Sequence, residues 1–363
     1  MSSTSTLPLA GLRVIEVGAV IAAPFCASLL ADLGAEVIKV EPPGTGDPFR
    51  AMGPSVNNVP LWWGVASRNK RCVTMDLKSE VDKRRFEVLV CSADVFIENN
   101  RPGALDRLGF GYDRLSRLNP RLVLVSISGF GQKGPDALRP GFGKIAEAMS
   151  GQVAVTGRPD ATPYHIGFSL ADTSSGLSGV FAIALILYLR DVEKRERGAY
   201  VDIALFEPLL RMQECQFALR EKIGRAPMRQ GSNDPYSWGV ASDVVITCHV
   251  CHDGAWLAIV TRPASPKTPA ELGAFVAARP ADAALADLAA LGVEAVRVHD
   301  GLSLAHSAYF RERGDVQQYR HSELGEITVP GVPPRVYGSA DRRVFRTPAV
   351  GEDNDWLAGA AQK

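Results

Sequence analysis

The chain has 363 residues, of which 46% are hydrophobic and 22% charged, and its 40 basic residues balance its 40 acidic ones. This length allows two or three domains with sizeable cores. A net charge of zero argues against a general nucleic-acid-binding protein and against a protein that binds membranes through a basic surface.

The amino-terminal residues 1–8 contain neither the charged segment nor the apolar stretch of a signal peptide. The longest apolar run, residues 177–189, is shorter than the roughly 20 residues that a transmembrane helix needs, so it predicts a buried helix. Six cysteines in a chain without a secretion signal are typical of reduced thiols. We therefore expect a cytoplasmic protein.

The amino-terminal half alternates strand and helix patterns. Apolar runs predict strands at 13–17, 36–40, 72–76, 94–98 and 122–127. Amphipathic or capped segments predict helices at 24–33, between the first two strands, and at 79–92, between the third and fourth. This alternation predicts an α/β fold with a doubly wound parallel sheet. Ligands of such sheets bind beyond the carboxyl ends of the strands, which here are residues 18–23, 41–47, 99–103 and 128–135. The glycines there do not form the GxGxxG pattern, which argues against a nicotinamide dinucleotide site.

The carboxyl-terminal half is mixed. It predicts, in chain order, a strand at 200–204, a helix at 207–222, a loop at 224–238, a hairpin at 244–260, a helix at 270–291, a strand at 294–298 and a Pro/Gly linker at 330–334. We therefore expect a large Rossmann-like domain at 1–224, completed by 330–363, and a small α+β domain at 225–329.

The segment His165–Gly176 places Asp172 directly before a Thr-Ser-Ser-Gly sequence and the apolar run. We predict that Asp172 is the N-cap of a helix that begins after this turn, because aspartate accepts hydrogen bonds from unpaired N–H groups. The same N–H groups and the helix dipole favour its ionised form. Asp172 is then either a plain cap or a nucleophile. His165 lines the same site or is a surface histidine.

The segment Cys248-His-Val-Cys-His252 resembles a haem-attachment motif or half of a zinc site. No export signal and no second Cys/His pair accompany it, and strand alternation sends Cys248 and Cys251 to opposite faces, so we expect no metal there. The G-x-S-x-G motif of α/β-hydrolases is absent at strand ends. Basic residues at 68–71 and 101 fit phosphate binding at the sheet edge as well as a solvated surface.

Taken together, many ordered segments resemble the class III coenzyme A transferases over most of the chain, namely residues 11–17, 24, 33–41, 69–78, 97–103, 126–135, 148–151, 170–176 and 291–296. The resemblance implies that Asp172 is the nucleophile. It also implies that coenzyme A is bound by Lys78, Asn99, Asn100, Arg101 and Arg107. It implies a CoA thioester as substrate without metal or redox cofactor, and an interlocked homodimer whose tail from about Pro334 returns to the large domain.

The resemblance further implies transfer of coenzyme A between an acyl-CoA and a carboxylic acid through an aspartyl-CoA intermediate, with a dicarboxylate donor such as succinyl-CoA. Backbone N–H groups of residues 173–176 are expected to stabilise the oxyanions.

Some positions depart from related families. The α-methylacyl-CoA racemases of the superfamily use a Gly-His-Asp segment, where this chain has Gly141-Phe-Gly143. Formyl-CoA transferases carry Gln at the position of Ile21 and Glu at that of Gly143, and the small domain here is short between Val260 and Ala270. Three alternatives stay open: an acyl-CoA racemase or isomerase, intramolecular CoA transfer within one dicarboxylate, and a non-catalytic CoA-binding protein.

Overall fold

The computed structural model describes residues 6–214, 216–224, 229–232, 244–321, 323–337 and 346–360. The chain forms two compact units. The first contains Met1–Ser150, Gly167–Met212 and Gln317–Lys363, and the second contains Gly151–Ile166 and Gln213–Val316. These units differ from the boundaries expected from the sequence at residues 151–166, 213–224 and 317–329. The functional division into a CoA-binding and a small domain stays a prediction.

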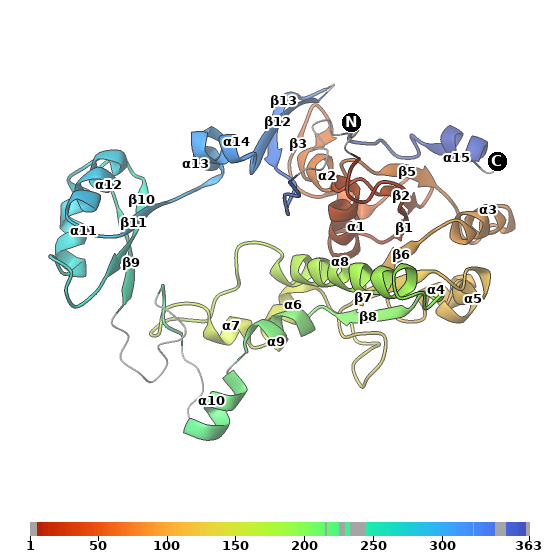
Figure 1. The fold of residues 1–363 in the computed structure, drawn as a ribbon, viewed down its shortest axis with the longest axis horizontal. Coiled ribbons are helices and arrows are strands. Elements are labelled where there is room, and N and C mark those ends of the chain that lie inside the picture. The colour runs from red at the N-terminus through yellow and green to blue at the C-terminus, as the bar shows by residue number, and fades with distance from the viewer. Residues whose placement is uncertain are drawn as a thin grey trace. The chain divides into compact units, whose positions relative to one another are not determined.

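The first unit is built on a six-stranded sheet in which every neighbouring pair is parallel (Figure 1). In spatial order the strands are β5 (Arg71–Thr74), β2 (Glu36–Glu41), β1 (Arg13–Val17), β6 (Val95–Glu98), β7 (Val123–Ser128) and β8 (Tyr200–Ala204). Along the chain, strands are added outward from β1 to β2 and β5 on one side, and from β6 to β7 and β8 on the other. The predicted α/β class and parallel sheet are confirmed, and the sheet reverses its winding between β1 and β6.

Helices cover both faces of this sheet. On one face α1 (Ala22–Asp32) and α8 (Leu170–Asp191) pack against side chains such as Val14, Val95 and Val125. On the other face α3 (Glu80–Cys91), α5 (Tyr112–Leu118) and α15 (Asn354–Ala360) pack against a second core around Ile15, Phe86 and Phe96. Successive strand residues point to opposite faces, so buried runs supply both cores.

Smaller elements complete the first unit. They are the 3-10 helix η1 (Pro48–Ala51), the helices α2 (Leu61–Ala66), α4 (Ala104–Leu108), α6 (Gly143–Met149) and α9 (Glu207–Met212), and the two-stranded sheets β3 (Ser55–Val56) with β4 (Val59–Pro60) and β12 (Val316–His321) with β13 (Gly325–Pro330). Tyr319 and Val329 of the last pair form a small core of their own.

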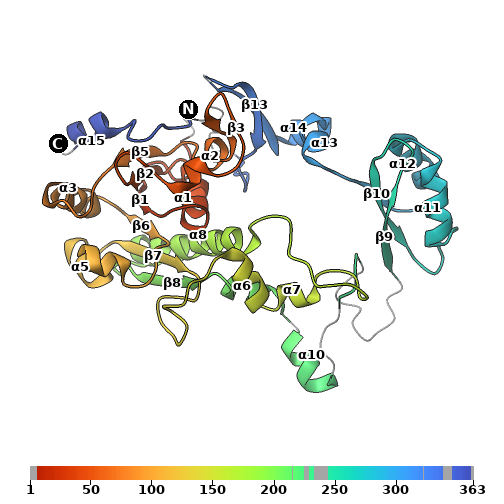
Figure 2. The ribbon, with the colours of Figure 1, turned by 180° about the vertical axis from the view of Figure 1, so that it is seen from behind.

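The second unit contains an antiparallel sheet of β9 (Val245–Val250), β10 (Trp256–Thr261) and β11 (Ala295–Val298). Its helices are α7 (Gln152–Val155), α10 (Gln216–Ile223), α11 (Pro269–Ala277), α12 (Ala281–Ala290), α13 (Gly301–His306) and α14 (Ala308–Arg313) (Figure 2). Leu257 and Ile259 of β10 pack against Leu272 and Leu288 of the helices to form its core. The predicted hairpin at 244–260 therefore corresponds to β9 and β10.

Two predicted helices are interrupted. The run 270–291 contains α11 and α12, because Pro280 has no N–H to continue the first helix and becomes the N-cap of the second. The run 207–222 contains α9 and α10. The polar tail after Pro334, for which no element was predicted, contains α15, and the expected loop at 224–238 lies largely outside the described residues.

Helix α8 is long and apolar enough to cross a membrane by length and composition alone. It is nevertheless a core helix, because it packs against α1, β7 and β8 in the first unit. The helix predicted from the apolar run 177–189 is confirmed, and it begins seven residues earlier than that run.

Candidate active site

The loops after β1 and β6 meet where the sheet reverses its winding. In open parallel sheets this reversal leaves a crevice at the carboxyl ends of the strands, where ligands bind. Here the loops at the crevice are residues 18–21 after β1 and 99–103 after β6. The two loops contact each other, because the side chain of Asn99 bonds both backbone groups of Ala19. A ligand at this fold's usual site therefore lies beside these loops.

Asp172 is the third residue of α8 and lies in its first turn. The N-cap is Ser169, so the prediction that Asp172 is the cap of a helix starting after residue 176 is wrong. Residues 173–176 are helical and form no turn: the N–H of Thr173 donates to the carbonyl of Ser169 at 3.0 Å, and the following N–H groups bond carbonyls one turn back. These N–H groups are already used, so they do not form the predicted oxyanion site.

The carboxylate of Asp172 is half-buried, and its pKa is raised from its ordinary 3.8 to about 6. Burial is the largest cause, since it disfavours the charged form. The backbone N–H of the same residue lowers the pKa, the carboxylate of Glu147 raises it, and the ammonium of Lys144 lowers it. Asp172 is thus mostly ionised at pH 7, while it is more basic than a solvated carboxylate.

Helix α6 supplies the residues that surround this carboxylate. A Cβ atom at Gly143 would overlap Oδ2 of Asp172, so the backbone of α6 lies directly against the carboxylate. One turn on, Glu147 is fully buried and bonds Lys144 at 3.0 Å, and Lys144 also donates to the carbonyl of Phe168, just before α8, at 2.9 Å. Lys144 and Glu147 were not predicted as site residues, because their i,i+3 spacing is typical of any helix surface.

Helices α1 and α8 run side by side and in parallel. A methyl group at Gly176 would lie 3.1 Å from the carbonyl oxygen of Ala22, and one at Gly179 would lie 2.9 Å from Sγ of Cys26. Residue numbers thus increase together along the two helices. Asp172 precedes Gly176 by one helical turn on the same face, so it lies level with the residues that precede Ala22, which are the loop 18–21.

Of the five predicted CoA-binding residues, three have exposed side chains: Lys78 in the turn after β5, Arg101 in the loop after β6, and Arg107 in α4. All three follow the carboxyl ends of strands. Strands β5 and β6 are three strand spacings apart, or about 14 Å. Lys78 is therefore placed for a different part of an extended ligand than the two arginines.

The other two predicted CoA-binding residues have their side-chain amides engaged within the protein. Asn99 bonds Ala19, and Nδ2 of Asn100 donates to the carbonyl of Val17 at 3.0 Å and to Glu98 at 3.1 Å. The structure thus places the amide of Asn99 against the loop after β1 and the amide of Asn100 against the last residues of β1 and β6.

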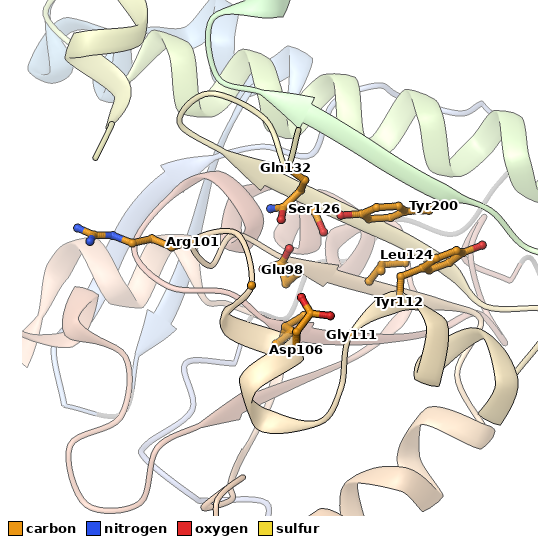
Figure 3. Close-up of a pocket in the computed structure, with 11 residues that line it drawn as sticks. Glu98, Arg101, Asp106, Gly111, Tyr112, Leu124, Ser126, Gln132 and Tyr200 are labelled. Carbon is orange, nitrogen blue, oxygen red and sulfur yellow. The ribbon is translucent and has the colours of Figure 1, made fainter. Parts of the chain in front are cut away.

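A small cavity of about 30 Å³ is lined by Glu98 of β6, by Leu124 and Ser126 of β7 and by Tyr200 of β8. Figure 3 shows Glu98, Ser126 and Gln132 gathered around it, whereas the side chain of Arg101 extends away. Burial raises the pKa of Glu98, and hydrogen bonds from Ser126 and Asn100 oppose that shift. The cavity has room for water only, since a water molecule needs roughly 10–15 Å³ of such space.

A larger cavity of about 550 Å³ lies between α2, β12 and residues 346–352. Two of its arginines are already paired: Arg50 with Glu41 at 2.7 Å, and Arg346 with Asp353 at 2.9 Å. Those two guanidinium groups are thus engaged within the protein and do not mark this cavity as an anion site.

Fully buried charges support the loop after β1, and the sequence analysis did not anticipate them. Nζ of Lys39 lies 2.6 Å from Glu16 and 2.7 Å from Asp47, and Nζ of Lys70 lies 2.8 Å from Glu16. Burial alone would lower the pKa of Lys39, but the two carboxylates raise it above its ordinary value. Lys70, which shares one carboxylate, has its pKa lowered by burial. These four residues, the buried charge cluster, connect β1, β2, the loop after β2 and the residue directly before β5.

His165 is exposed and belongs to the second unit. Cys248 is exposed and Cys251 buried at the end of β9, and all five cysteines of the described residues are free thiols. Within the described ranges, no group of three or more His, Cys, Asp or Glu side chains is placed to hold a metal ion.

Comparison with known proteins places this site in a family. Residues 9–266 and 261–354 match the sequence model described as CoA-transferase family III. The chain belongs to CoA-transferase family III. The predicted family and enzyme class, a CoA-transferase, are therefore confirmed.

Two relatives illustrate the family. The succinyl-CoA–D-citramalate CoA-transferase of Chloroflexus aurantiacus is 34% identical over 96% of this chain and 92% of its own length. The acetyl-CoA:oxalate CoA-transferase of Acetobacter aceti is 42% identical over 63% of this chain and 59% of its own length. Among solved structures, a CaiB/BaiF family protein from Brucella suis superimposes with a TM-score of 0.86 at 28% identity, covering 98% of this chain and 100% of that one. The family III fold thus extends over both units.

Proposed function

We propose that this protein transfers coenzyme A from an acyl-CoA to a carboxylic acid through a covalent aspartyl-CoA thioester at Asp172, with a dicarboxylate donor such as succinyl-CoA. The named relatives act on succinyl-CoA or acetyl-CoA and on carboxylic acids, which supports this substrate class. The carboxylate of Asp172 carries the proposal, because it is half-buried, ionised at neutral pH and more basic than a solvated carboxylate.

The chemistry proceeds in four acyl-transfer steps. A carboxylate oxygen of Asp172 attacks the thioester carbon, and the C–S bond breaks. CoA leaves as a thiolate, and Asp172 is then joined to the acyl group in a mixed anhydride. The thiolate attacks the aspartyl carbonyl and releases the donor acid, which leaves the aspartyl-CoA thioester. The acceptor carboxylate then displaces CoA to form a second anhydride, and the thiolate attacks its acyl carbon, which restores Asp172. Covalent catalysis divides one difficult transfer into these easier steps.

The surroundings of Asp172 fit this sequence of charge changes. The carboxylate is negative before the reaction and neutral in both the anhydride and the thioester. Burial favours the neutral forms, because a charge is costly in a site with little water. The raised pKa of Asp172 reports this preference. The exposed side chains of Lys78, Arg101 and Arg107 are cations suited to the phosphates of CoA at the same edge of the sheet.

Intact-protein mass spectrometry tests the proposal. The protein is mixed separately with succinyl-CoA, acetyl-CoA and butyryl-CoA, and the Asp172→Ala variant serves as the control. We expect a CoA-sized adduct that hydroxylamine removes, absent from the variant, with succinyl-CoA the best donor. An adduct that survives in the variant would assign the nucleophile to another residue.

Mass analysis of the acyl-CoA products of the same mixtures, together with a CoA-binding assay, separates the alternative functions. Solvent deuterium entering the acyl chain without an acceptor acid would indicate a racemase or isomerase. CoA binding without any adduct would indicate a non-catalytic CoA-binding protein. Transfer within one dicarboxylate, with no second acid added, would indicate the intramolecular reaction. The racemase has little support in the structure, since Gly143 lies against Asp172 and carries no acid or base.

We also propose that the protein is a homodimer, with interlocked chains as in the family resemblance, and that it is cytoplasmic. One face of α8 supports the dimer, because apolar side chains at helical spacing are exposed there, namely Leu177, Phe181, Leu185 and Tyr188. A second copy that covers this face would remove the stripe from water. Sedimentation of the wild type is expected to give twice the mass of 39.0 kDa.

A further inference from the structure

The loop after β1 holds a strained residue. Val20 has φ of 65°, in the left-handed region that β-branched residues avoid. A residue in such a strained conformation persists only where its surroundings fix it. The neighbouring residues Gly18 to Ile21 are therefore shaped by contacts from outside the loop.

Asn99 supplies two of these contacts from the loop after β6. Its Oδ1 accepts from the N–H of Ala19 at 2.8 Å, and its Nδ2 donates to the carbonyl of Ala19 at 2.8 Å. One side-chain amide thus satisfies both backbone groups of a single residue, 80 positions away in the chain. An amide is suited to this pairing, since it presents a donor and an acceptor side by side.

The buried charge cluster holds the same loop from the other side. Oδ1 of Asp47 accepts from the N–H of Val20 at 3.1 Å, and Nζ of Lys39 donates to the carbonyl of Gly18 at 2.9 Å. Three consecutive residues of the loop are therefore fixed by side chains from three different segments. The loop is rigid at the point where the parallel packing of α1 and α8 brings Asp172 level with it.

We infer that Asn99 is a positioning residue for the reaction at Asp172, an inference that rests on the proposed function. Asn99 acts by fixing loop 18–21, which forms the wall opposite the carboxylate. This differs from the CoA contact that the resemblance implied for Asn99. An acyl group that reacts with Asp172 must be held within a fraction of an ångström of the attacking oxygen. A loop that is free to relax from its strained conformation would lose that precision, while the distant CoA phosphates would bind as before.

Two variants test the inference by separating kcat from KM. Asn99→Ala removes both contacts, and Asn99→Asp keeps the bond from the N–H of Ala19 but turns the contact with its carbonyl repulsive. Because aspartate is nearly the same shape as asparagine, the second variant guards against a folding defect in the first. For both we expect kcat to fall at least about tenfold and the acyl-CoA KM to stay within about threefold. The matched control Arg107→Ala is expected to show the opposite split.

The outcomes are distinguishable. A tenfold rise in KM with kcat retained in either folded variant would show that Asn99 binds CoA. Wild-type values of both kcat and KM would show that the loop needs no support from Asn99. Each of these two results would overturn the inference. The rate of adduct formation is measured in parallel by mass spectrometry. If the wild type itself forms no adduct, the proposed function fails, whereas a wild-type adduct that forms equally fast in the variants contradicts the positioning role alone.

Discussion

The buried charge cluster beside β1 and the carboxylate of Asp172 in the first turn of α8 both belong to the first unit, yet their charges are compensated differently. Glu16, Lys39, Asp47 and Lys70 are each within 2.8 Å of an opposite charge, with almost no exposed surface. Asp172 is half-buried, and the nearest cation on α6, Lys144, is paired with Glu147. The first arrangement fixes backbone, whereas the second leaves a carboxylate in an unfavourable charged state that reaction relieves.

Neutralising Asp172 is expected to have the largest effect on activity. Asp172→Asn should lower the transfer rate by more than about a thousandfold, because the amide is no nucleophile. The same change should raise the free energy of unfolding at pH 7 by about 1–3 kcal/mol, because a pKa raised to about 6 from 3.8 means that the folded state disfavours the charge. Steady-state kinetics and urea denaturation measure the two effects.

The sign of this stabilisation can be checked by pH. Above pH 6 the wild type carries the full cost of the buried charge. As the pH falls from about 6 to about 4 the folded wild type takes up a proton, and the advantage of the variant disappears. An Asp172→Asn protein that is less stable than the wild type at pH 7 would contradict the comparison.

Neutralising a carboxylate of the buried charge cluster should have the opposite effect on stability. Glu16→Gln leaves Lys39 and Lys70 without one shared partner, and breaking a buried pair costs about 3–5 kcal/mol. The matched control is Glu36→Gln, whose partners Arg13 and Arg71 are partly exposed, and it should cost less than about 1 kcal/mol. Urea denaturation measures the free energy of unfolding of both variants. Equal losses of stability would show that the buried and the partly exposed ion pairs do not differ in their contribution.

The smallest expected effect is on the pH profile. Since the reaction needs ionised Asp172, kcat/KM should fall as the pH drops through about 6. Glu147→Gln removes a negative charge that raises this pKa, so the midpoint should move to lower pH, whereas Lys144→Met should move it to higher pH. A midpoint that does not respond to either change would show that these two residues do not act on Asp172.

The strands of the six-stranded sheet could be predicted because each contains a short run of apolar, mostly β-branched residues. The shorter or more polar strands β3, β4, β12 and β13 were not predicted. β1 and β8 have the expected bounds, Arg13–Val17 and Tyr200–Ala204. The start of α8 could not be placed, because Thr-Ser-Ser-Gly resembles a turn by composition although it continues the helix that Leu170 begins. There, packing against α1 outweighs local preference, and small residues permit the close approach.

The candidate site was only partly predictable. The sequence and the resemblance identified Asp172, whereas the burial of Glu147 and the contact of Asn99 with Ala19 depend on which segments the fold brings together. A Lys-x-x-Glu pair is typical of a solvated helix surface, so Lys144 and Glu147 gave no sign of proximity to Asp172. Asparagine also binds ligands and backbone equally well, and only tertiary contacts decide between the two.

The two glycines of α8 determine how closely this helix approaches α1. Because Gly176 and Gly179 let α8 touch α1, the depth of the carboxylate beside loop 18–21 is determined by side-chain volume four and seven residues further along the helix. A Cβ atom at Gly176 would lie 2.8 Å from the ring of Phe25 and 3.1 Å from the carbonyl oxygen of Ala22, so an alanine there would force these neighbours or α8 to shift. The pattern Asp-x-x-x-Gly-x-x-Gly therefore sets the position of the carboxylate through the distance between two helices. Protein design can change that position at the two glycines, without altering any residue that contacts the substrate.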